Sequence, residues 1–437
     1  MKKRALVLAF TGASLAFASN AFAGQREDVA KRWAPVFEQE VRDGKDLFTA
    51  YDFDGNWAGD DNLENMSSCI SGKSTCDLTA KVYFTVIETS SHWFVQYLPY
   101  HAIDGKVTNG HEHDTESVFA VVTKDGTPTG KLLAVEVRFH LDWFIYADSS
   151  VVKDGAKTID GAINADATGH PQVYVQQVGH GFCGGFSPPN NVFPDLQLTC
   201  KHSDKPHIDG TGVIYRPDQA VTAPTITKNQ TVTVGYAMEE ILTTFWARRT
   251  EVGPGKAFKS LVDFAGERCN VLKCPKQFGG AFMGDNGESP SGPWNQDAGA
   301  GTTGQGSQFF DPAYTMSKRL TFASGFSLDY CHNPYLGIVD QCAKPQSTDP
   351  STPTDPTKPG SETKPSDPAS TSTTTVAQDD SSSSETNESG CSTTPTRVDA
   401  SSVLLVTFAG MSTLRRRRRA GVVEAERAPA SPHCSKL

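Results

Sequence analysis

The sequence predicts an all-β fold, a β-sandwich with a few packed helices, followed by a disordered stalk and a short apolar, arginine-rich tail. Two adjacent runs carry this prediction, because residues 81–89 (KVYFTVIET) and 91–100 (SHWFVQYLPY) are rich in β-branched and aromatic residues. Residues 132–146 alternate between apolar and polar positions, which predicts one half-buried strand with a wet face. Turn-forming stretches such as 124–130 (KDGTPTG) separate these runs.

Further strands and two helices complete the predicted body of the protein. The segments 172–178 (QVYVQQV) and 230–237 (QTVTVGYA) continue the series of strands. Apolar residues at helical spacing predict one helix within residues 25–48 and a second at 237–249. The apolar stripe of the second helix is more typical of a core than of a cofactor site.

The chain divides into five predicted segments: a signal peptide (1–23), a β-sandwich body (24–343), a disordered linker (344–390), an apolar and arginine-rich tail (391–419) and a C-terminal extension (420–437). A basic start, an apolar run and an Ala-Phe-Ala cleavage site predict the signal peptide, and hence export. The linker contains almost only Ser, Thr, Pro, Asp, Glu and Lys, so it buries too little apolar surface to fold.

Cysteine usage agrees with export into an oxidising compartment. The chain has 10 cysteines, and an even number in the body of an exported protein predicts disulfides. Nearest-neighbour pairing would join Cys69 to Cys76, Cys183 to Cys200, Cys269 to Cys274, and Cys331 to Cys342. None of these pairs has the C-x-x-C spacing of a zinc knuckle, so zinc ligation by cysteine is disfavoured.

Charge and motifs exclude several classes of function. The formal net charge of -10 leaves no basic patch in the body, so no nucleic-acid partner is predicted. The sequence contains neither the G-x-S-x-G of a hydrolase elbow nor the H-E-x-x-H of a zinc protease. Residues 179–185 (GHGFCGG) lack the Lys-Ser/Thr of a phosphate-binding loop, which favours a disulfide-anchored turn.

Residues 109–122 (NGHEHDTESVFAVV) form the strongest candidate site. On a strand, Asp114 and Glu116 share one face, and both faces become apolar beyond them, which indicates an interior strand. Buried carboxylates need a positive partner, and a divalent cation with a neighbouring imidazole would supply it. A solvated junction between a loop and a strand explains the same residues equally well on chemical grounds.

The motif Gly110-His111-x-His113-Asp114-x-Glu116 resembles the GHRHDWE heptapeptide of the necrosis- and ethylene-inducing-peptide-like proteins (NLPs), which are secreted toxins of plant-associated microbes. The upstream FVQYLPY resembles the YxWYxPKD element of that family. The segment QVYVQQVGHGF resembles a later strand of vacuolar-sorting-associated-like secreted proteins.

The resemblance implies a β-sandwich that binds Ca²⁺ or Mg²⁺, with Mn²⁺ and Zn²⁺ as alternatives. The implied metal ligands are His111, Asp114, Glu116 and Asp104. His113, Glu112 and His180 are further candidates for the site or its surroundings. Thr115 stands where the family has Trp, so the resemblance supports a fold and a cation more than a cytolytic activity.

The tail resembles a second family pattern, the MYXO-CTERM sorting signal of myxobacteria. Cys391-Ser-Thr-Thr-Pro, an apolar run and five consecutive arginines follow one another as they do in that signal. The resemblance implies processing near Cys391 by a sorting protease and attachment at the cell surface, the outer membrane, or release into the medium. An ordinary solvated basic tail is the alternative interpretation.

Three functions remain open from the sequence. The first is a metal-binding, surface-anchored module, NLP-like, that engages membrane lipids or glycans. The second is an extracellular metal-dependent hydrolase in which His113 or Glu112 acts as a base. The third is a structural cell-surface protein. Since no second acid/base or nucleophile constellation is present, the sequence favours a binding protein over an enzyme.

Overall fold

The computed structural model describes residues 24–72, 75–105, 110–140, 142–184, 210–284, 291–294 and 306–342. These residues form mainly strands, with a few short helices, which confirms the predicted all-β class. The predicted signal peptide, linker, tail with Cys391 and C-terminal extension lie outside them. The chain separates into two units, Met1–Thr352 and Pro353–Leu437, and every described residue belongs to the first. Within these ranges no helix is both long and apolar enough to cross a bilayer.

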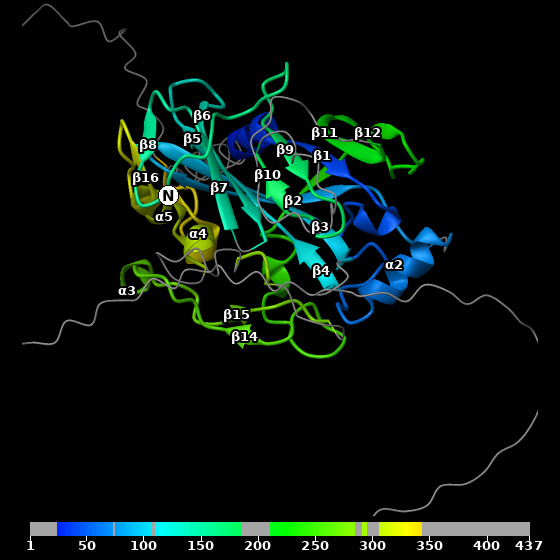
Figure 1. Cartoon of the computed structure of the whole chain (residues 1–437). Coiled ribbons are helices and arrows are strands. Elements are labelled where there is room, and N and C mark those ends of the chain that lie inside the picture. The colour runs from blue at the N-terminus through cyan, green and yellow to red at the C-terminus, as the bar shows by residue number, and fades with distance from the viewer. Residues whose placement is uncertain are drawn as a thin grey trace, which may run out of the picture. The chain divides into compact units, whose positions relative to one another are not determined.

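The larger of the two main sheets has eight strands in the order β13-β2-β3-β5-β6-β7, with β17 beside β2 and β4 beside β3 (Figure 1). Its strands are β13 (Ala237–Glu240), β2 (Lys81–Thr89), β3 (His92–Asp104), β5 (Val118–Thr123), β6 (Lys131–Phe139), β7 (Asp142–Ala147), β17 (Tyr330–His332) and β4 (His111–Thr115). The strands predicted at 81–89 and 91–100 are confirmed as β2 and β3, an antiparallel pair.

The smaller sheet lies across one face of the larger sheet and completes a sandwich. Its order is β10 (Phe182–Cys183), β9 (Gln172–Val175), β1 (Val36–Glu40), β11 (Gly212–Val221) and β12 (Thr231–Gly235). Phe37, Val173 and Val213 of this sheet share one apolar cluster with Val95 and Val135 of the larger sheet. Burial of apolar side chains between two sheets is what stabilises a sandwich.

The opposite face of the larger sheet is buried as well. A second apolar cluster joins Phe94 and Phe119 of that sheet to Phe258, Trp294 and Phe310 from later parts of the chain. The elements on this side are η3 (Trp246–Arg248), β14 (Leu261–Val262), α3 (Cys269–Leu272), β15 (Phe278–Gly279), α4 (Ser307–Phe310), α5 (Pro312–Arg319), β16 (Leu320–Phe322), which pairs with β8 (Val152–Asp154), and η4 (Pro334–Leu336). This third layer explains why β2 is apolar on both faces.

The wet face predicted for residues 132–146 is therefore wrong at Glu136, whereas Arg138 and His140 are partly exposed and Asp142 is exposed. Glu136 is buried and forms an ion pair with the buried Arg319. It also accepts a hydrogen bond from Nε2 of Gln308 at 2.7 Å. The segment is also two strands rather than one, because β6 ends before His140, whose φ of 58° turns the chain into β7.

The first predicted helix is confirmed only in its first part, and the second is wrong. Residues 24–33 are helical, but the strand β1 begins at Val36, directly after Pro35, whose missing N–H and restricted φ break a helix. The segment 237–249 starts as β13, which pairs in parallel with β2, and continues through turns to η3. Pairing with an existing sheet outweighs the modest helix propensity of this short run.

The disulfide predictions are confirmed in part. Cys69–Cys76 and Cys331–Cys342 are formed. Cys183 is disulfide-bonded, and its predicted partner Cys200 lies outside the described residues.

The predicted Cys269–Cys274 disulfide is not formed in this structure, in which both cysteines are free thiols. Helix α3 and the left-handed residue Lys273 separate the two cysteines. Their sulfur atoms therefore meet in a hydrogen bond rather than a covalent bond.

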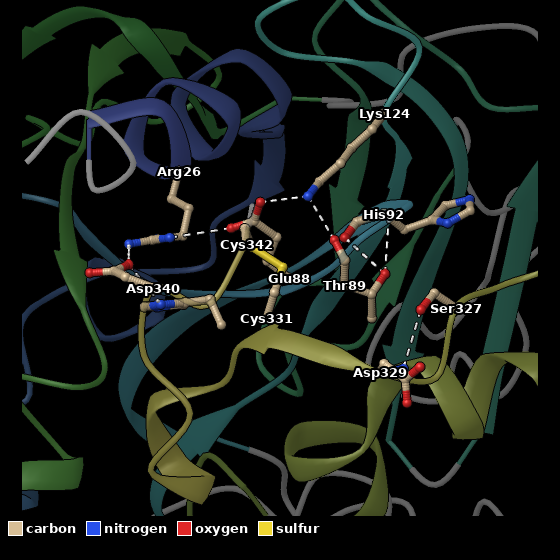
Figure 2. Close-up of a disulfide and its surroundings, with 11 residues drawn as sticks. Arg26, Glu88, Thr89, His92, Lys124, Ser327, Asp329, Cys331, Asp340 and Cys342 are labelled. Atoms are coloured by element: carbon tan, nitrogen blue, oxygen red, sulfur yellow. Dashed lines mark hydrogen bonds and ion pairs between the residues drawn. A yellow bond between two sulfur atoms is a disulfide. The ribbon is translucent and has the colours of Figure 1, made fainter. Parts of the chain in front are cut away.

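The Cys331–Cys342 disulfide lies beside a group of four charges, two buried and two partly exposed, here called the Glu88 cluster: Arg26, Glu88, Lys124 and Asp340 (Figure 2). The carboxylate of Glu88 accepts hydrogen bonds from Arg26 at 3.2 Å and from Lys124 at 2.5 Å. Arg26 also donates to Asp340 at 2.5 Å. The ion pair between Arg26 and Asp340 therefore connects the N-terminal helical residues of the body to its C-terminal residues.

Candidate metal centre

The candidate motif lies on β4, which pairs antiparallel with the end of β3. The register places Asp114 opposite His101 and His111 opposite Asp104. The chain does not run straight from β4 into β5. His113 has a φ of 58°, and the strand is interrupted after Thr115, so the continuous strand predicted for this stretch is two separate strands. Neighbours in the motif consequently face different partners.

Asp114 belongs to a fully buried set of side chains, here called the histidine cluster: Asp46, His101, Asp114 and His180. The Nδ1 atom of His180 lies 2.9 Å from a carboxylate oxygen of Asp114, and its Nε2 atom lies 3.3 Å from Asp46. Asp46 ends the short helix η1 (Gly44–Asp46) and accepts hydrogen bonds from the backbone N–H groups of Arg42 at 2.6 Å and Val178 at 3.1 Å. One imidazole thus bridges two buried carboxylates.

The charges of these groups depend on one another. Burial disfavours the charged form of His180, but the hydrogen bonds to Asp114 and Asp46 outweigh burial and raise its pKa to about 9. Burial likewise opposes ionisation of Asp114 and Asp46, yet the hydrogen bond from His180 holds the pKa of each below its usual range. Without a metal ion, a His180 imidazolium is the cation that neutralises this site.

His101 is the member of the cluster that the motif did not reveal. Its ring stacks on that of His180, with centroids 3.6 Å apart and an angle of 5° between the planes. The Nε2 atom lies 3.1 Å from Nε2 of Gln39, whereas Nδ1 is buried without a hydrogen-bond partner among the described residues. Burial lowers the pKa of His101 well below its ordinary value. His101 meets Asp114 through the pairing of β3 with β4, so no local motif of the sequence marks it.

The other three implied ligands lie outside this cluster. Asp104 faces His111, with 3.8 Å between Oδ2 and Nε2. Glu116 accepts a hydrogen bond from the backbone N–H of His140 at 3.0 Å and lies 3.5 Å from Nε of Arg138. Of the four ligands that the motif implies, only Asp114 therefore joins the histidine cluster, together with the predicted neighbour His180.

The remaining motif residues anchor other parts of the chain to β4. The ring of His113 contacts the hydroxyl of Tyr100 at 2.7 Å and the carbonyl oxygens of Gly59 at 2.9 Å and Met283 at 2.5 Å. Burial lowers the pKa of His113 to about 4, so this ring is neutral near pH 7. Glu112 accepts a hydrogen bond from the backbone N–H of Leu63, in the first turn of α2 (Asn62–Ile70). Neither residue is placed to act as a base on a substrate.

Comparison with known proteins gives structural similarities only. No family model and no curated protein matches the sequence. The structure is similar to that of Necrosis and Ethylene inducing Protein 2 from the causal agent of cocoa's Witches Broom disease, with 19% identity and a TM-score of 0.22, over 34% of this chain and 60% of that one. It is also similar to NLPPya in complex with glucosamine, with 16% identity and a TM-score of 0.24, over 36% and 67% of the two chains. The chain resembles NLP toxins in structure.

A further solved structure, described as a toxin fold for microbial attack and plant defense, shows the same similarity. It is 14% identical, with a TM-score of 0.23, over 48% of this chain and 74% of that one. The first of the three similarities spans less than two thirds of the matched protein.

The histidine cluster has the donor atoms of a metal site. One ligand atom each from His101, Asp114 and His180 lies within 4.8 Å of the other two. Two imidazole nitrogens and a carboxylate oxygen form a common ligand set for divalent transition metals. The buried Nδ1 of His101, which has no hydrogen-bond partner in the described part of the chain, also agrees with a ligand role. The residues present therefore fit a divalent cation.

The described residues contain a second group of this kind, formed by Glu88, Cys331 and Cys342. Its two sulfur atoms are joined in a disulfide, which leaves no thiolate to bind a metal. Glu88 already contacts two cationic side chains, Arg26 and Lys124. This group is structural.

Proposed function

We propose that the protein is an exported, NLP-like cation-binding protein that engages membrane lipids or glycans at the edge of its sandwich. The observation that carries this proposal is the buried convergence of His101, Asp114 and His180. A cation at this position would join the end of β3, strand β4 and the segment after β9, and would hold the neighbouring loops in one arrangement. The motif resemblance supports a lipid or glycan as the partner.

Burial of the cluster favours binding over hydrolysis. His101 and His180 are each 0% exposed, so a cation between them would be enclosed by protein. A catalytic metal needs an open coordination position for water or substrate. The cluster therefore supports a cation that stabilises a binding surface.

Elemental analysis of the full mature chain and its melting temperature with and without a chelator test the cation. The expected result is a bound divalent metal whose removal lowers the melting temperature. A metal-free protein whose melting no divalent cation changes would overturn the proposal. Two assays test the partner: co-sedimentation with liposomes of varied lipid composition, and binding to immobilised glycans. Binding in neither assay would leave the protein only a structural role.

Surface attachment through the tail is a separate part of the proposal. Cleavage near Cys391 would leave the folded body attached to the cell surface through residues 344–390. Protease shaving and fractionation of cells that produce the wild-type chain or Cys391→Ser test this step. A Cys391→Ser chain that stays on the surface would contradict it.

A further inference from the structure

The donor atoms of the histidine cluster differ from those that Ca²⁺ and Mg²⁺ prefer. Calcium takes six to eight oxygen ligands, and magnesium takes oxygen ligands in near-ideal octahedral geometry. The cluster offers two nitrogens, from His101 and His180, and the oxygens of Asp114. Imidazole nitrogen favours Zn²⁺ and related transition metals.

Among the described residues, neither Asp104 nor Glu116 is grouped with the close donor atoms of His101, Asp114 and His180. Asp104 faces His111, and Glu116 contacts the backbone of His140 and the side chain of Arg138. The register places Asp104 three positions further along β3 than His101. An oxygen-only shell would therefore require rearrangement of strand pairing that the antiparallel register fixes.

Asp46 completes an arrangement typical of zinc sites. Its carboxylate lies 3.3 Å from Nε2 of His180, whereas Nδ1 of the same ring points to Asp114. A carboxylate on one imidazole nitrogen fixes the tautomer and orients the other nitrogen towards the metal. Three backbone N–H groups, those of Arg42, Asp43 and Val178, hold Asp46 in place.

We propose that this site selects a divalent transition metal, with Zn²⁺ as the probe, over Ca²⁺ and Mg²⁺. His101, Asp114 and His180 are the ligands, and Asp46 positions His180. The proposal rests on the cation-binding function above and narrows it to a class of metal. It departs from the cation that the motif resemblance implies, because an imidazole stands opposite Asp114.

Equilibrium dialysis of the chelator-treated mature chain against Zn²⁺, Ca²⁺ or Mg²⁺ at equal free concentration tests the proposal. A Cys269→Ser/Cys274→Ser background removes the free thiols as a competing zinc site. The expected result is about one Zn²⁺ per chain and a higher melting temperature in Zn²⁺ alone. His101→Asp is expected to weaken Zn²⁺ binding at least about 100-fold, and Asp46→Asn about 10- to 100-fold.

His92→Asn is the matched control, since His92 is an equally buried imidazole outside the cluster. It is expected to retain Zn²⁺ binding within about threefold. Equal losses in His92→Asn and His101→Asp would overturn the assignment. Retention of Ca²⁺ or Mg²⁺ but not Zn²⁺ would overturn this inference alone, whereas binding of no ion would overturn the proposed function with it.

A spectrum of the cobalt-loaded wild-type chain keeps the test decisive if the variants do not fold. Nitrogen and oxygen ligation would give ligand-field bands without a thiolate charge-transfer band, which supports the proposal. A thiolate band would place the metal at cysteine residues, such as the free Cys269 and Cys274, and overturn it.

Discussion

The histidine cluster and the Glu88 cluster both bury carboxylates in the same body, but they neutralise them with different cations. Glu88 meets Arg26 and Lys124, whose charges are permanent at neutral pH. Asp46 and Asp114 meet His180, whose charge depends on its pKa. A side chain that stays protonated offers no donor atom to a metal ion. An imidazole can lose its proton and bind a metal ion through the same nitrogen.

The comparison also shows why proximity of metal-capable atoms is not enough to define a site. Glu88 with Cys331 and Cys342, and His101 with Asp114 and His180, each bring three such side chains together. In the first group, the two sulfurs are bonded to each other. In the second, the buried Nδ1 of His101 has no hydrogen-bond partner among the described residues. Whether its donor atoms are already bonded therefore decides if such a group can bind a metal ion or only stabilises the fold.

The largest expected effect comes from removing one charge from each cluster. Asp114→Asn and Glu88→Gln should each lower the free energy of unfolding by about 4 kcal/mol, because each removes a buried carboxylate from a buried cation, His180 or Arg26. Only Asp114→Asn should abolish Zn²⁺ binding. Chemical denaturation and metal dialysis of both variants measure this, with the exposed Asp329→Asn as control. Equal loss of bound Zn²⁺ in both variants would contradict the assignment of the metal site to the histidine cluster alone.

pH should separate the two clusters in the metal-free protein. The pKa of His180 is raised to about 9, so its stabilisation is complete below the unfolded value near 6.5 and is lost as pH rises through 9. The expected loss is about 3 kcal/mol. Burial and Arg26 lower the pKa of His332, beside Asp340, to about 4, so its contribution is lost as pH falls from 6.5 towards 4.

Thermal melting across pH 5 to 10 checks this behaviour. His101, His113 and His92, with lowered pKa values, add to the acid loss, so the alkaline limb is the specific test of the histidine cluster. Saturating Zn²⁺ should abolish the loss of stability at alkaline pH, because the metal ion replaces the proton on His180. A His180→Gln chain with the same alkaline loss as wild type would contradict the assignment.

Loss of the Cys331–Cys342 disulfide should affect the Glu88 cluster and leave the histidine cluster unchanged. The Cys331–Cys342 bond closes a loop with a sequence separation of 11, so Cys331→Ser/Cys342→Ser should cost about 2–3 kcal/mol of stability. The loop carries Asp340, so amide exchange near Arg26 should increase. Zn²⁺ affinity should stay within about twofold of wild type, as expected for distant sites. Cys69→Ser/Cys76→Ser is the matched control.

The sequence predicted those parts of the fold that depend on local pattern. β2 and β3 are long runs of β-branched and aromatic residues, and their pairing follows directly. β1 and β13 were taken for helix because their apolar residues also fit helical spacing. Only their partners in the two sheets, such as β9, β11 and β2, decide in favour of strand.

In the candidate site as well, residues within local motifs were predicted and residues from distant positions were missed. Asp114 and His180 were predicted from motifs, whereas Asp46 was missed because it lies 134 positions before His180 and meets it only through the tertiary fold. The Glu88 cluster was missed for the same reason, since 314 positions separate Arg26 from Asp340. Long-range contacts of single polar side chains leave no periodic signal in a sequence.

The smallest expected effect distinguishes the metal ligands that the motif implies from those that the structure brings together. The motif implies Asp104 as a metal ligand, but the structure places it against His111 at 3.8 Å and not among the close donor atoms of His101, Asp114 and His180. Asp104→Asn should therefore change stability by about 1 kcal/mol or less and Zn²⁺ affinity by less than about threefold. Dialysis beside Asp114→Asn measures the contrast. A 100-fold loss in Asp104→Asn would mean that β3 and β4 rearrange around the metal, and that the motif describes the metal-bound state better than the register does.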